Sequence, residues 1–257
     1  MKIIKTLFLL LLCTAAFAQK KELPEDVVAS IKSRIEFGLT PSIVVGIIDK
    51  DGMHFYSFGT KTVGGEPVDE HSIYEIGSIS KTFTATLLAD NIVKGKMKVD
   101  DPISKYLPAS VKVPTYKGGG PPITLGHLSD HTSSMLRMPT NMPESDPTDP
   151  AADYTPELMY AFLSSYELPR EVGSEYEYSN FAVGVLGQIQ ALVAGTSYEE
   201  ALTSVITSPL KMKETAITLS PKMKENLAVG HSMGMPVNNW DLNAMQGAGG
   251  IRSSAHD

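Results

Sequence analysis

Cysteine is nearly absent from this sequence: Cys13 is the only one among 257 residues, which excludes a disulfide bond within the chain. Positive charge is also scarce, because 22 lysines and arginines face 29 aspartates and glutamates, with a net charge of −7 and no basic cluster. Phosphate binding needs clustered positive charge, so we expect no nucleic-acid partner. With 42% hydrophobic and 20% charged residues, the composition is that of a globular protein, which excludes a disordered chain and a multi-span membrane protein.

Residues 1–18 predict a secretory signal peptide. They combine a positively charged start, an apolar run too short to span a bilayer, and an A-x-A cleavage site that ends at Ala18. Leu12 precedes Cys13 where a lipoprotein signal has a small residue, so we expect simple cleavage. The mature protein would begin at Gln19, contain no cysteine and no stable membrane span, and be secreted into the periplasm. Thiol catalysis is excluded on this interpretation.

Local patterns predict an α+β organisation. A helical period covers residues 24–39, and two β-rich segments at 42–49 and 53–60 flank the turn Lys50-Asp51-Gly52, which is typical of a hairpin. From residue 78 to 207 nearly every periodic segment indicates helix. Strands followed by a long helical region argue against alternating βαβ units and a doubly wound sheet.

Capping residues mark where the helices begin and end. We expect one helix from about residue 78 to Gly95, one from Thr155 to about residue 168, one over 181–194 with Asn180 as its cap, and one that opens with a capping box at 196–199 and stops before Pro209.

Three serine motifs compete for the role of nucleophile, and the first is Ser78-x-x-Lys81. The S-x-x-K pattern arises about once by chance in a chain of this length, so the surroundings decide. Ser78 begins an apolar helix, whose N-terminus stabilises developing negative charge. Lys81 follows on the same helix face, where partial burial would lower its pKa and let it accept the serine proton. The alternative is an ordinary N-cap serine beside a solvated lysine.

The other two serines have weaker surroundings. Ser208-x-x-Lys211 lies at the end of a predicted helix, followed by Pro209, which favours a structural role. Ser232 lies in the G-x-S-x-G string at 230–234, and Asp241 and His256 follow it in the order of an α/β-hydrolase triad. A nucleophile elbow needs a strand before the serine and a helix after it, and the flanking residues favour a glycine-rich loop instead.

Tyr178-x-Asn180 is a further candidate, in a loop just before a predicted helix. A tyrosine close to a lysine can share its proton and act as acid or base. Asn180 would also serve as the helix cap.

His127 and His131 are spaced as a metal pair on one helix face. However, Leu128 stands where the zincin pattern has glutamate, and no third ligand is evident, so we expect no metal. Gly118-Gly119-Gly120 precedes two prolines and no helix, which argues against a phosphate loop.

Taken together, Ser78-x-x-Lys81 and Tyr178-x-Asn180 resemble the serine β-lactamase and penicillin-binding DD-peptidase superfamily, in its class C-like branch. The resemblance extends in order over residues 25–257. It implies an α+β, β-lactamase/transpeptidase-like fold, with an antiparallel sheet flanked by helices and a largely helical region. The supporting segments are 74–85 around the nucleophile, LSDHTSS at 128–134 with Ser134 in place of the usual glycine, PLKMKET at 209–215, and AGGIRSSAHD at 248–257.

The resemblance also implies roles for the four residues. Ser78 would attack the carbonyl of a β-lactam or a D-Ala-D-Ala-type amide to form an acyl-enzyme, Lys81 would ease its deprotonation, and Tyr178 would protonate the leaving nitrogen. Asn180 would bind the side-chain amide of the substrate, and the backbone N–H of Ser78 would supply half of an oxyanion hole. No metal and no cofactor is implied. The expected partner is a small-molecule β-lactam or cell-wall peptide, and the expected state is a monomer.

One element of the superfamily is not found. Its third motif, Lys-Thr-Gly or His-x-Gly on a strand after the A-G-G segment, does not occur after Asn180. We therefore expect 19–257 to be a C-terminally incomplete domain: 19–75 with a helix and hairpin, 76–246 mainly helical, and 247–257 opening a part whose strands are missing. Two other functions stay open, namely a truncated non-catalytic secreted module and an esterase that uses Ser232.

Overall fold

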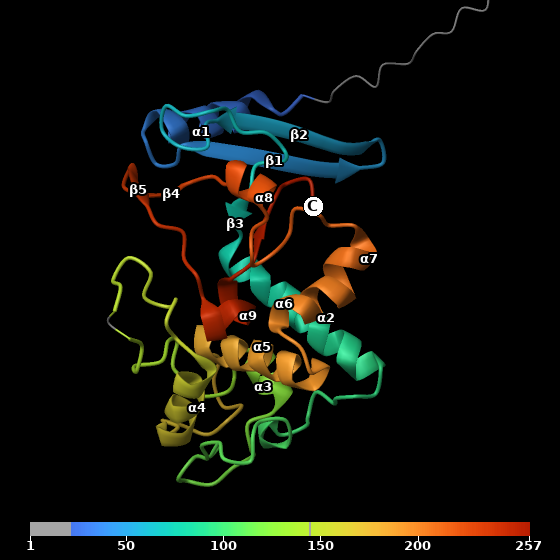
Figure 1. Cartoon of the computed structure of the whole chain (residues 1–257), viewed down its shortest axis with the longest axis vertical. Coiled ribbons are helices and arrows are strands. Elements are labelled where there is room, and N and C mark those ends of the chain that lie inside the picture. Colours follow the sequence, from blue (N-terminus) through green and yellow to red (C-terminus); the bar gives the residue numbers. More distant parts are fainter. Residues whose placement is uncertain (1–21, 144) are drawn as a thin grey trace, which may run out of the picture.

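The computed structural model describes residues 22–143 and 145–257, and the expected signal peptide lies outside them. A hairpin forms a layer at one end of the molecule, above a larger helical body (Figure 1). The strands are β1 (Ser42–Asp49), β2 (Gly52–Gly59), β3 (Tyr74–Glu75), β4 (Gly230–Ser232), β5 (Met235–Val237) and β6 (Arg252–Ser253). The helices are α1 (Glu25–Glu36), α2 (Ser80–Val93), α3 (Leu125–Ser129), α4 (Pro156–Ser165), α5 (Asn180–Ala194), α6 (Tyr198–Leu202), α7 (Ser208–Leu210), α8 (Pro221–Glu225) and α9 (Gln246–Gly249), with 3₁₀ turns at Gly77–Ile79, Ile103–Lys105 and Asn243–Met245.

The hairpin of β1 and β2 confirms the sequence-based expectation. The strands pair antiparallel from Ser42 opposite Gly59 to Asp49 opposite Gly52, so β2 begins one residue earlier than predicted. Gly52 has a φ of +119°, which only glycine adopts readily and which closes the turn. β-Branched residues dominate β1 and favour the extended backbone. Helix α1 packs against β2.

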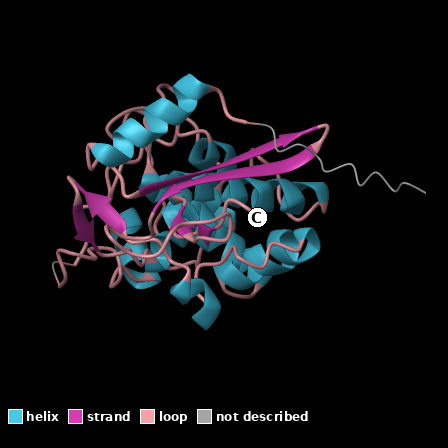
Figure 2. Ribbon diagram, turned by 90° about the horizontal axis from the view of Figure 1, so that it is seen from above, coloured by secondary structure: helices cyan, strands magenta, loops and turns pink. Residues whose placement is uncertain are grey.

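Helix α5 forms the centre of the helical body. Ten of its fifteen residues are buried, so it is covered on nearly all sides as a core helix. It packs against α2, α3, α6 and α9. In the view from above, helices lie on both sides of the two long strands of the hairpin (Figure 2). Phe181 at its start lies against Phe162 of α4, with the two ring planes nearly perpendicular.

A short antiparallel ladder joins distant parts of the chain. Tyr74 of β3 lies opposite Ser253 of β6, and Glu75 lies opposite Arg252. Buried Arg252 donates hydrogen bonds to the carbonyl oxygens of Ile217 and Trp240 and to the carboxylate of Asp241. In the described ranges the strands form three two-stranded sheets, together with mainly helical segments, which confirms the α+β class.

Several helix ends differ from the prediction. Ser179, and not Asn180, caps α5, because its hydroxyl accepts from the N–H of Ala182 at 2.9 Å. The capping box of α6 pairs Ser197 with Glu200, one residue later than predicted.

Pro209 does not end the helical region. A π-helical turn at Thr203–Thr207 leads into α7, where Pro209 occupies the first turn and needs no backbone hydrogen bond. The helical segment thus runs without a break from Tyr198 to Leu210, and Ser208 lies in its last turn.

Within the described residues, no single helix is long and apolar enough to cross a bilayer. Helix α5 and the segment Tyr198–Leu210 meet that test only as a pair, bent by 77°.

The contact between α5 and α9 generates a prediction about stability. A Cβ at Gly187 would come within 2.9 Å of the Cα of Gly247, which is backbone and cannot rotate away. We expect Gly187→Ala to lower the free energy of unfolding by about 1–2 kcal/mol, since overpacking outweighs the gain in helix propensity. Urea denaturation measures the change. Exposed Ala194→Ser on the same helix is the control, expected within about 0.5 kcal/mol of the native chain, and equal stability of the two variants would contradict the close contact.

Candidate active site

Ser78 lies in the 3₁₀ turn Gly77–Ile79 that leads directly into α2. Gly77 has a φ of +50°, which turns the backbone between β3 and this helical segment. The N–H of Ile76 donates to the carbonyl of Ile251 at 3.1 Å, so the ladder next to β6 positions the turn. Neither the turn nor α2 is capped by a side chain, and the N-cap alternative for Ser78 is therefore wrong.

The Ser78 hydroxyl receives two hydrogen bonds. Lys81 Nζ lies 3.1 Å from Ser78 Oγ, and the hydroxyl of Tyr178 donates to the same oxygen at 2.6 Å. Ser78 and Lys81 are one helical turn apart, whereas Tyr178 comes from the loop before α5. The structure thus brings Tyr178 to Ser78 and Lys81, although Ser78 and Tyr178 are a hundred residues apart in the sequence.

Lys81 is held by three acceptors from three segments. Besides Ser78 Oγ, its Nζ lies 2.8 Å from Asn180 Oδ1 and 2.6 Å from the carbonyl oxygen of Ala248. An ammonium has three N–H donors and no acceptor, so this arrangement satisfies the protonated form completely. The four candidate residues therefore form one hydrogen-bonded group. They are Ser78, Lys81, Tyr178 and Asn180.

The loop that carries Tyr178 and Asn180 is attached to the segment at 131–138. The backbone N–H of Asn180 donates to the carbonyl of Arg137 at 2.9 Å, and the Ser179 hydroxyl donates to the carbonyl of Leu136 at 2.6 Å. The Ser179 N–H also donates to Nδ1 of His131 at 3.2 Å. These bonds hold the Tyr-x-Asn segment in place at the start of α5.

Burial and positive charge change the ionisation of the group. Burial is the main cause that lowers the pKa of Lys81, and the charge of Arg137 lowers it further. Burial alone would raise the pKa of Tyr178, but hydrogen bonding with Lys81 and Ser78 and the charges of Lys81 and Arg137 outweigh it, so that pKa is lowered. A tyrosine with a lowered pKa can accept the Ser78 proton more readily.

Tyr178 is flanked by three further side chains. Lys81 Nζ and the guanidinium carbon of Arg137 each lie 4.9 Å from the centre of the Tyr178 ring. The ring of His131 lies 4.5 Å from it, centre to centre. Burial, followed by the charge of Lys81, lowers the pKa of His131, which favours a neutral imidazole beside the two cations.

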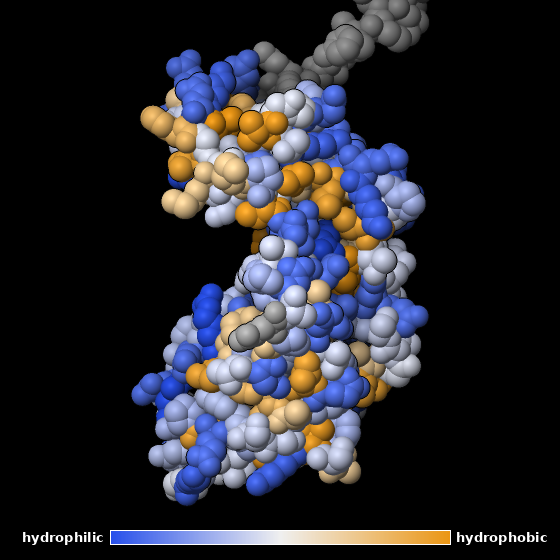
Figure 3. All heavy atoms as spheres, turned by 60° about the vertical axis from the view of Figure 1, so that its left-hand side comes forward, coloured by the Kyte–Doolittle hydropathy of each residue, from blue (hydrophilic) through white to orange (hydrophobic). Residues whose placement is uncertain are grey.

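A cavity of about 400 Å³ opens beside Ser78. Apolar side chains form most of its wall, so a ligand there would be partly removed from water. The lining residues are Glu75, Gly77, Ser78, Met138, Ala151, Asn180, Trp240, Leu242, Met245, Ala248 and Gly249. In the space-filling view the outline narrows to a hollow between the hairpin layer and the helical body (Figure 3).

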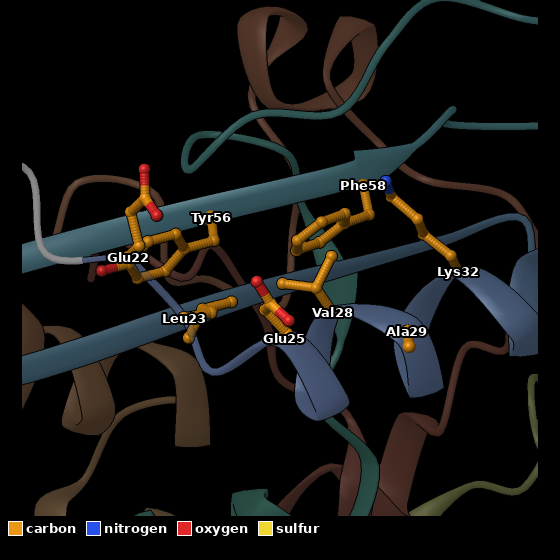
Figure 4. Close-up of a pocket in the computed structure, with 8 residues that line it drawn as sticks. All are labelled: Glu22, Leu23, Glu25, Val28, Ala29, Lys32, Tyr56 and Phe58. Atoms are coloured by element: carbon orange, nitrogen blue, oxygen red, sulfur yellow. The ribbon is translucent and has the colours of Figure 1, made fainter.

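A larger hollow of about 550 Å³ lies elsewhere, between α1 and β2. Glu25, Val28, Ala29 and Lys32 face Tyr56 and Phe58 across it (Figure 4). The hollow contains none of the candidate nucleophiles, so chemistry and not size assigns the site to the cavity at Ser78.

In the part of the chain that the structure describes, Ser232 has no comparable group of hydrogen-bonded partners. Ser232 ends β4, and a tight turn at Met233 and Gly234 leads into β5, so the strand–turn–helix of a nucleophile elbow is not formed. His256 stacks on Phe55 and lies tilted against His71, and Asp241 accepts from Arg252. The triad interpretation of Ser232 is therefore wrong.

The histidine pair also separates. His127 lies in α3 and forms a capping box with Thr124, whereas His131 follows the helix in a left-handed conformation with φ of +66°. The two side chains do not share a helix face, so the proposed spacing for a metal pair does not apply.

Sequence reasoning missed Arg137, the support by His131, and the carbonyl of Ala248. A backbone oxygen has no sequence signal, and Arg137 is a single cation 41 residues before Tyr178 along the chain. The segment LSDHTSS at 128–134 supports the resemblance to the superfamily, but the motif does not indicate that its histidine, His131, contacts Tyr178.

Comparison with known proteins shows which family the chain belongs to. Residues 31–257 match the model of a family described as Beta-lactamase. The chain is 31% identical over 262 residues to the D-alanyl-D-alanine-carboxypeptidase/endopeptidase AmpH of Escherichia coli (strain K12), over 98% of this chain and 66% of that protein. It is 29% identical over 237 residues to a Beta-lactamase of the same strain, over 91% of this chain and 59% of that protein.

Solved structures show the same likeness. A Beta-lactamase/D-alanine Carboxypeptidase from Yersinia pestis, complexed with citrate, superposes with a TM-score of 0.76 at 28% identity, over 90% of this chain and 65% of that chain. A class C beta lactamase from Rhodobacter sphaeroides superposes with a TM-score of 0.74 at 28% identity, over 90% and 62%. The chain thus spans less than two thirds of the length of these proteins, and the β-lactamase-like fold expected from the sequence is confirmed.

The electrostatics generate a prediction about pH. Reaction of Ser78 with a serine-reactive phosphonate should speed up as pH rises, because deprotonation of the lysine–tyrosine pair supplies the base. The charge of Arg137 lowers both pKa values, so Arg137→Ala should move the midpoint of the profile to higher pH and slow labelling at neutral pH. Mass spectrometry of the adduct measures the rate. Arg137→Lys, which keeps the charge, should shift the midpoint less; an unchanged midpoint in Arg137→Ala would show that Arg137 does not act on the pair.

Proposed function

Because the chain belongs to the β-lactamase family, we propose that it is a serine hydrolase that opens β-lactam or D-Ala-D-Ala-type amide bonds through an acyl-enzyme on Ser78. The observation that carries this proposal is the pair of hydrogen bonds from Lys81 and Tyr178 to one serine oxygen at the edge of a cavity. Relatives named as a D-alanyl-D-alanine-carboxypeptidase/endopeptidase and as a β-lactamase support both substrate classes.

Tyr178 is the proposed base. Its lowered pKa makes loss of its own proton to solvent easier, and the phenolate so formed takes the proton of Ser78 as the serine oxygen forms a bond to the substrate carbonyl carbon. Lys81 stays protonated in this step, since Asn180 and Ala248 both accept from it, and its charge stabilises the phenolate. Tyr178 then gives the proton to the amide nitrogen as the C–N bond breaks.

Hydrolysis of the acyl-enzyme completes the reaction. A water molecule loses a proton to Tyr178 and attacks the ester carbon, and Ser78 leaves as its oxygen regains the proton. The helix N-terminus near Ser78 favours the negative charge on the carbonyl oxygen in both steps.

Asn180 is the proposed substrate-binding residue. Its Oδ1 accepts from Lys81, which orients the amide, and its Nδ2 lies 3.4 Å from Met138 Sδ at the wall of the cavity. A sulfur is a weak acceptor, so a substrate carbonyl is a better partner for this N–H₂ group. We propose that this group binds the acyl side-chain amide.

We also propose that the protein is exported. Residues 1–18 have the three parts of a signal peptide, and cleavage after Ala18 would deliver the enzyme to the compartment that holds cell-wall peptides. Expression in a bacterium with an outer membrane should yield a periplasmic protein whose intact mass begins at Gln19. Retention of residues 1–18 on the purified protein would contradict the signal-peptide assignment, and Ala18→Pro is the variant expected to block cleavage.

Labelling by a fluorescent penicillin tests the catalytic proposal. We expect one covalent adduct, mapped by peptide mass spectrometry to Ser78, and none in Ser78→Ala. Tyr178→Phe should slow adduct formation by about 10²–10⁴-fold, because it removes the proton carrier and leaves the ring in place.

Ser232→Ala is the matched control and should label like the native chain. Label at Ser232, or hydrolysis of a simple ester that Ser232→Ala abolishes, would establish the esterase instead. A folded chain that neither labels with penicillin nor cleaves a D-Ala-D-Ala peptide would establish the non-catalytic module.

A further inference from the structure

Two histidines and a glutamate meet away from Ser78, in a place that the proposed reaction does not use. They are His71, Glu214 and His256, and one ligand atom from each lies within 4.8 Å of the others. Nδ1 of His71 lies 3.0 Å from Glu214 Oε2, and the imidazole rings of the two histidines are 5.0 Å apart. The three residues come from three segments separated by more than forty residues in the sequence.

Backbone hydrogen bonds bring the segments that carry these three residues together. Beyond the paired residues of β3 and β6, the N–H of His256 donates to the carbonyl of Glu70, the chain neighbour of His71, at 3.0 Å. On the other side of β6, Arg252 exchanges two backbone hydrogen bonds with Ala216, which positions the Glu214 segment. The cluster is therefore anchored by the same ladder that precedes Ser78.

The donor set is that of a divalent transition metal. Two imidazole nitrogens and one carboxylate oxygen form a ligand set that zinc adopts in proteins, with a fourth position left for water. Zinc–ligand distances of about 2.0–2.1 Å place neighbouring ligand atoms about 3–3.5 Å apart, which the His71–Glu214 distance already matches. We propose that His71, Glu214 and His256 bind a zinc ion.

Side-chain rotation alone can close the remaining distance. The side chains of His71 and His256 are 43% and 44% exposed, so they can turn toward an ion without displacing the core, and solvent can reach the fourth position. Glu214 is more enclosed, at 17%, and provides the fixed ligand.

Asp257 supports the arrangement from outside the ligand set. Its Oδ2 accepts from the N–H of Glu214 at 2.6 Å and from the Thr215 hydroxyl at 3.0 Å. Its Oδ1 lies 3.5 Å from Nδ1 of His256, which leaves Nε2 of that ring for the ion. A carboxylate behind a metal-binding histidine is the usual outer partner, because it sets the tautomer and orients the ring.

The ion would act as a cross-link. With Cys13 as the sole cysteine, the chain cannot form a disulfide, and a metal that joins residues 71, 214 and 256 closes two long loops in its place. It would fasten the ladder of β3 and β6 at the end away from Ser78. The proposal does not depend on the reaction proposed for Ser78.

Titration of the tag-free chain with zinc chloride tests the proposal. Calorimetry should show one site with a micromolar or lower Kd, and a zinc concentration about 100 times Kd should raise the midpoint of thermal unfolding by about 5 °C or more. The chain has six histidines, so the imidazole NMR signals can be followed individually. Those of His71 and His256 should shift on zinc addition, and that of His131 should not.

The variants His71→Gln and His256→Gln should each weaken zinc binding by at least about tenfold. His54→Gln is the matched control, because His54 pairs with the single carboxylate of Asp49, with no second histidine in that pair, and should bind zinc like the native chain. Circular dichroism reports whether each variant is folded. If a variant does not fold, the NMR shifts of His71 and His256 in the native chain decide whether these histidines bind zinc. Absence of zinc binding by the native chain, or binding by both glutamine variants that equals native binding, would overturn the assignment.

Discussion

The ammonium group of Lys81 holds three segments of this protein together. It donates to Ser78 at the start of α2, to Asn180 at the start of α5 and to the carbonyl of Ala248 in α9. A half-buried charge that lost these partners would carry a large desolvation cost. The segments are therefore constrained to one arrangement, and in that arrangement Tyr178 reaches the serine hydroxyl.

The fold supplies this arrangement through a few buried contacts between α2 and the segment at 247–251. The buried hydroxyl of Ser80 accepts from the N–H of Ile251, and that of Thr84 donates to the carbonyl of Gly247. Gly187 of α5 and Gly247 lie so close that a Cβ on either would come within 2.9 Å of the Cα of the other. Together these contacts place the Ala248 carbonyl within reach of Lys81, which makes the packing of α9 part of the site.

Local patterns predicted the helices and strands well where one residue type determines the local backbone conformation. Alternation and the turn at Gly52 predicted the hairpin to within one residue, and the S-x-x-K spacing placed Ser78 and Lys81 one helical turn apart. Patterns failed where two residues compete for one role. Ser179 caps α5 in place of Asn180, because the side-chain oxygen of Asn180 accepts a hydrogen bond from Lys81. Pro209 was expected to end a helix, yet it fits in the first turn of α7.

The sequence by itself determined which residues are candidates for the chemistry, since only certain side chains can attack, transfer a proton or bind an amide. It also determined the order of hairpin and helices, because those depend on neighbours along the chain. Only the tertiary structure decided that Tyr178 faces Ser78, that Ala248 accepts from Lys81 through its backbone, and that His131 and Arg137 surround the tyrosine. Hydrogen bonds between segments a hundred residues apart depend on packing, which local periodicity does not encode.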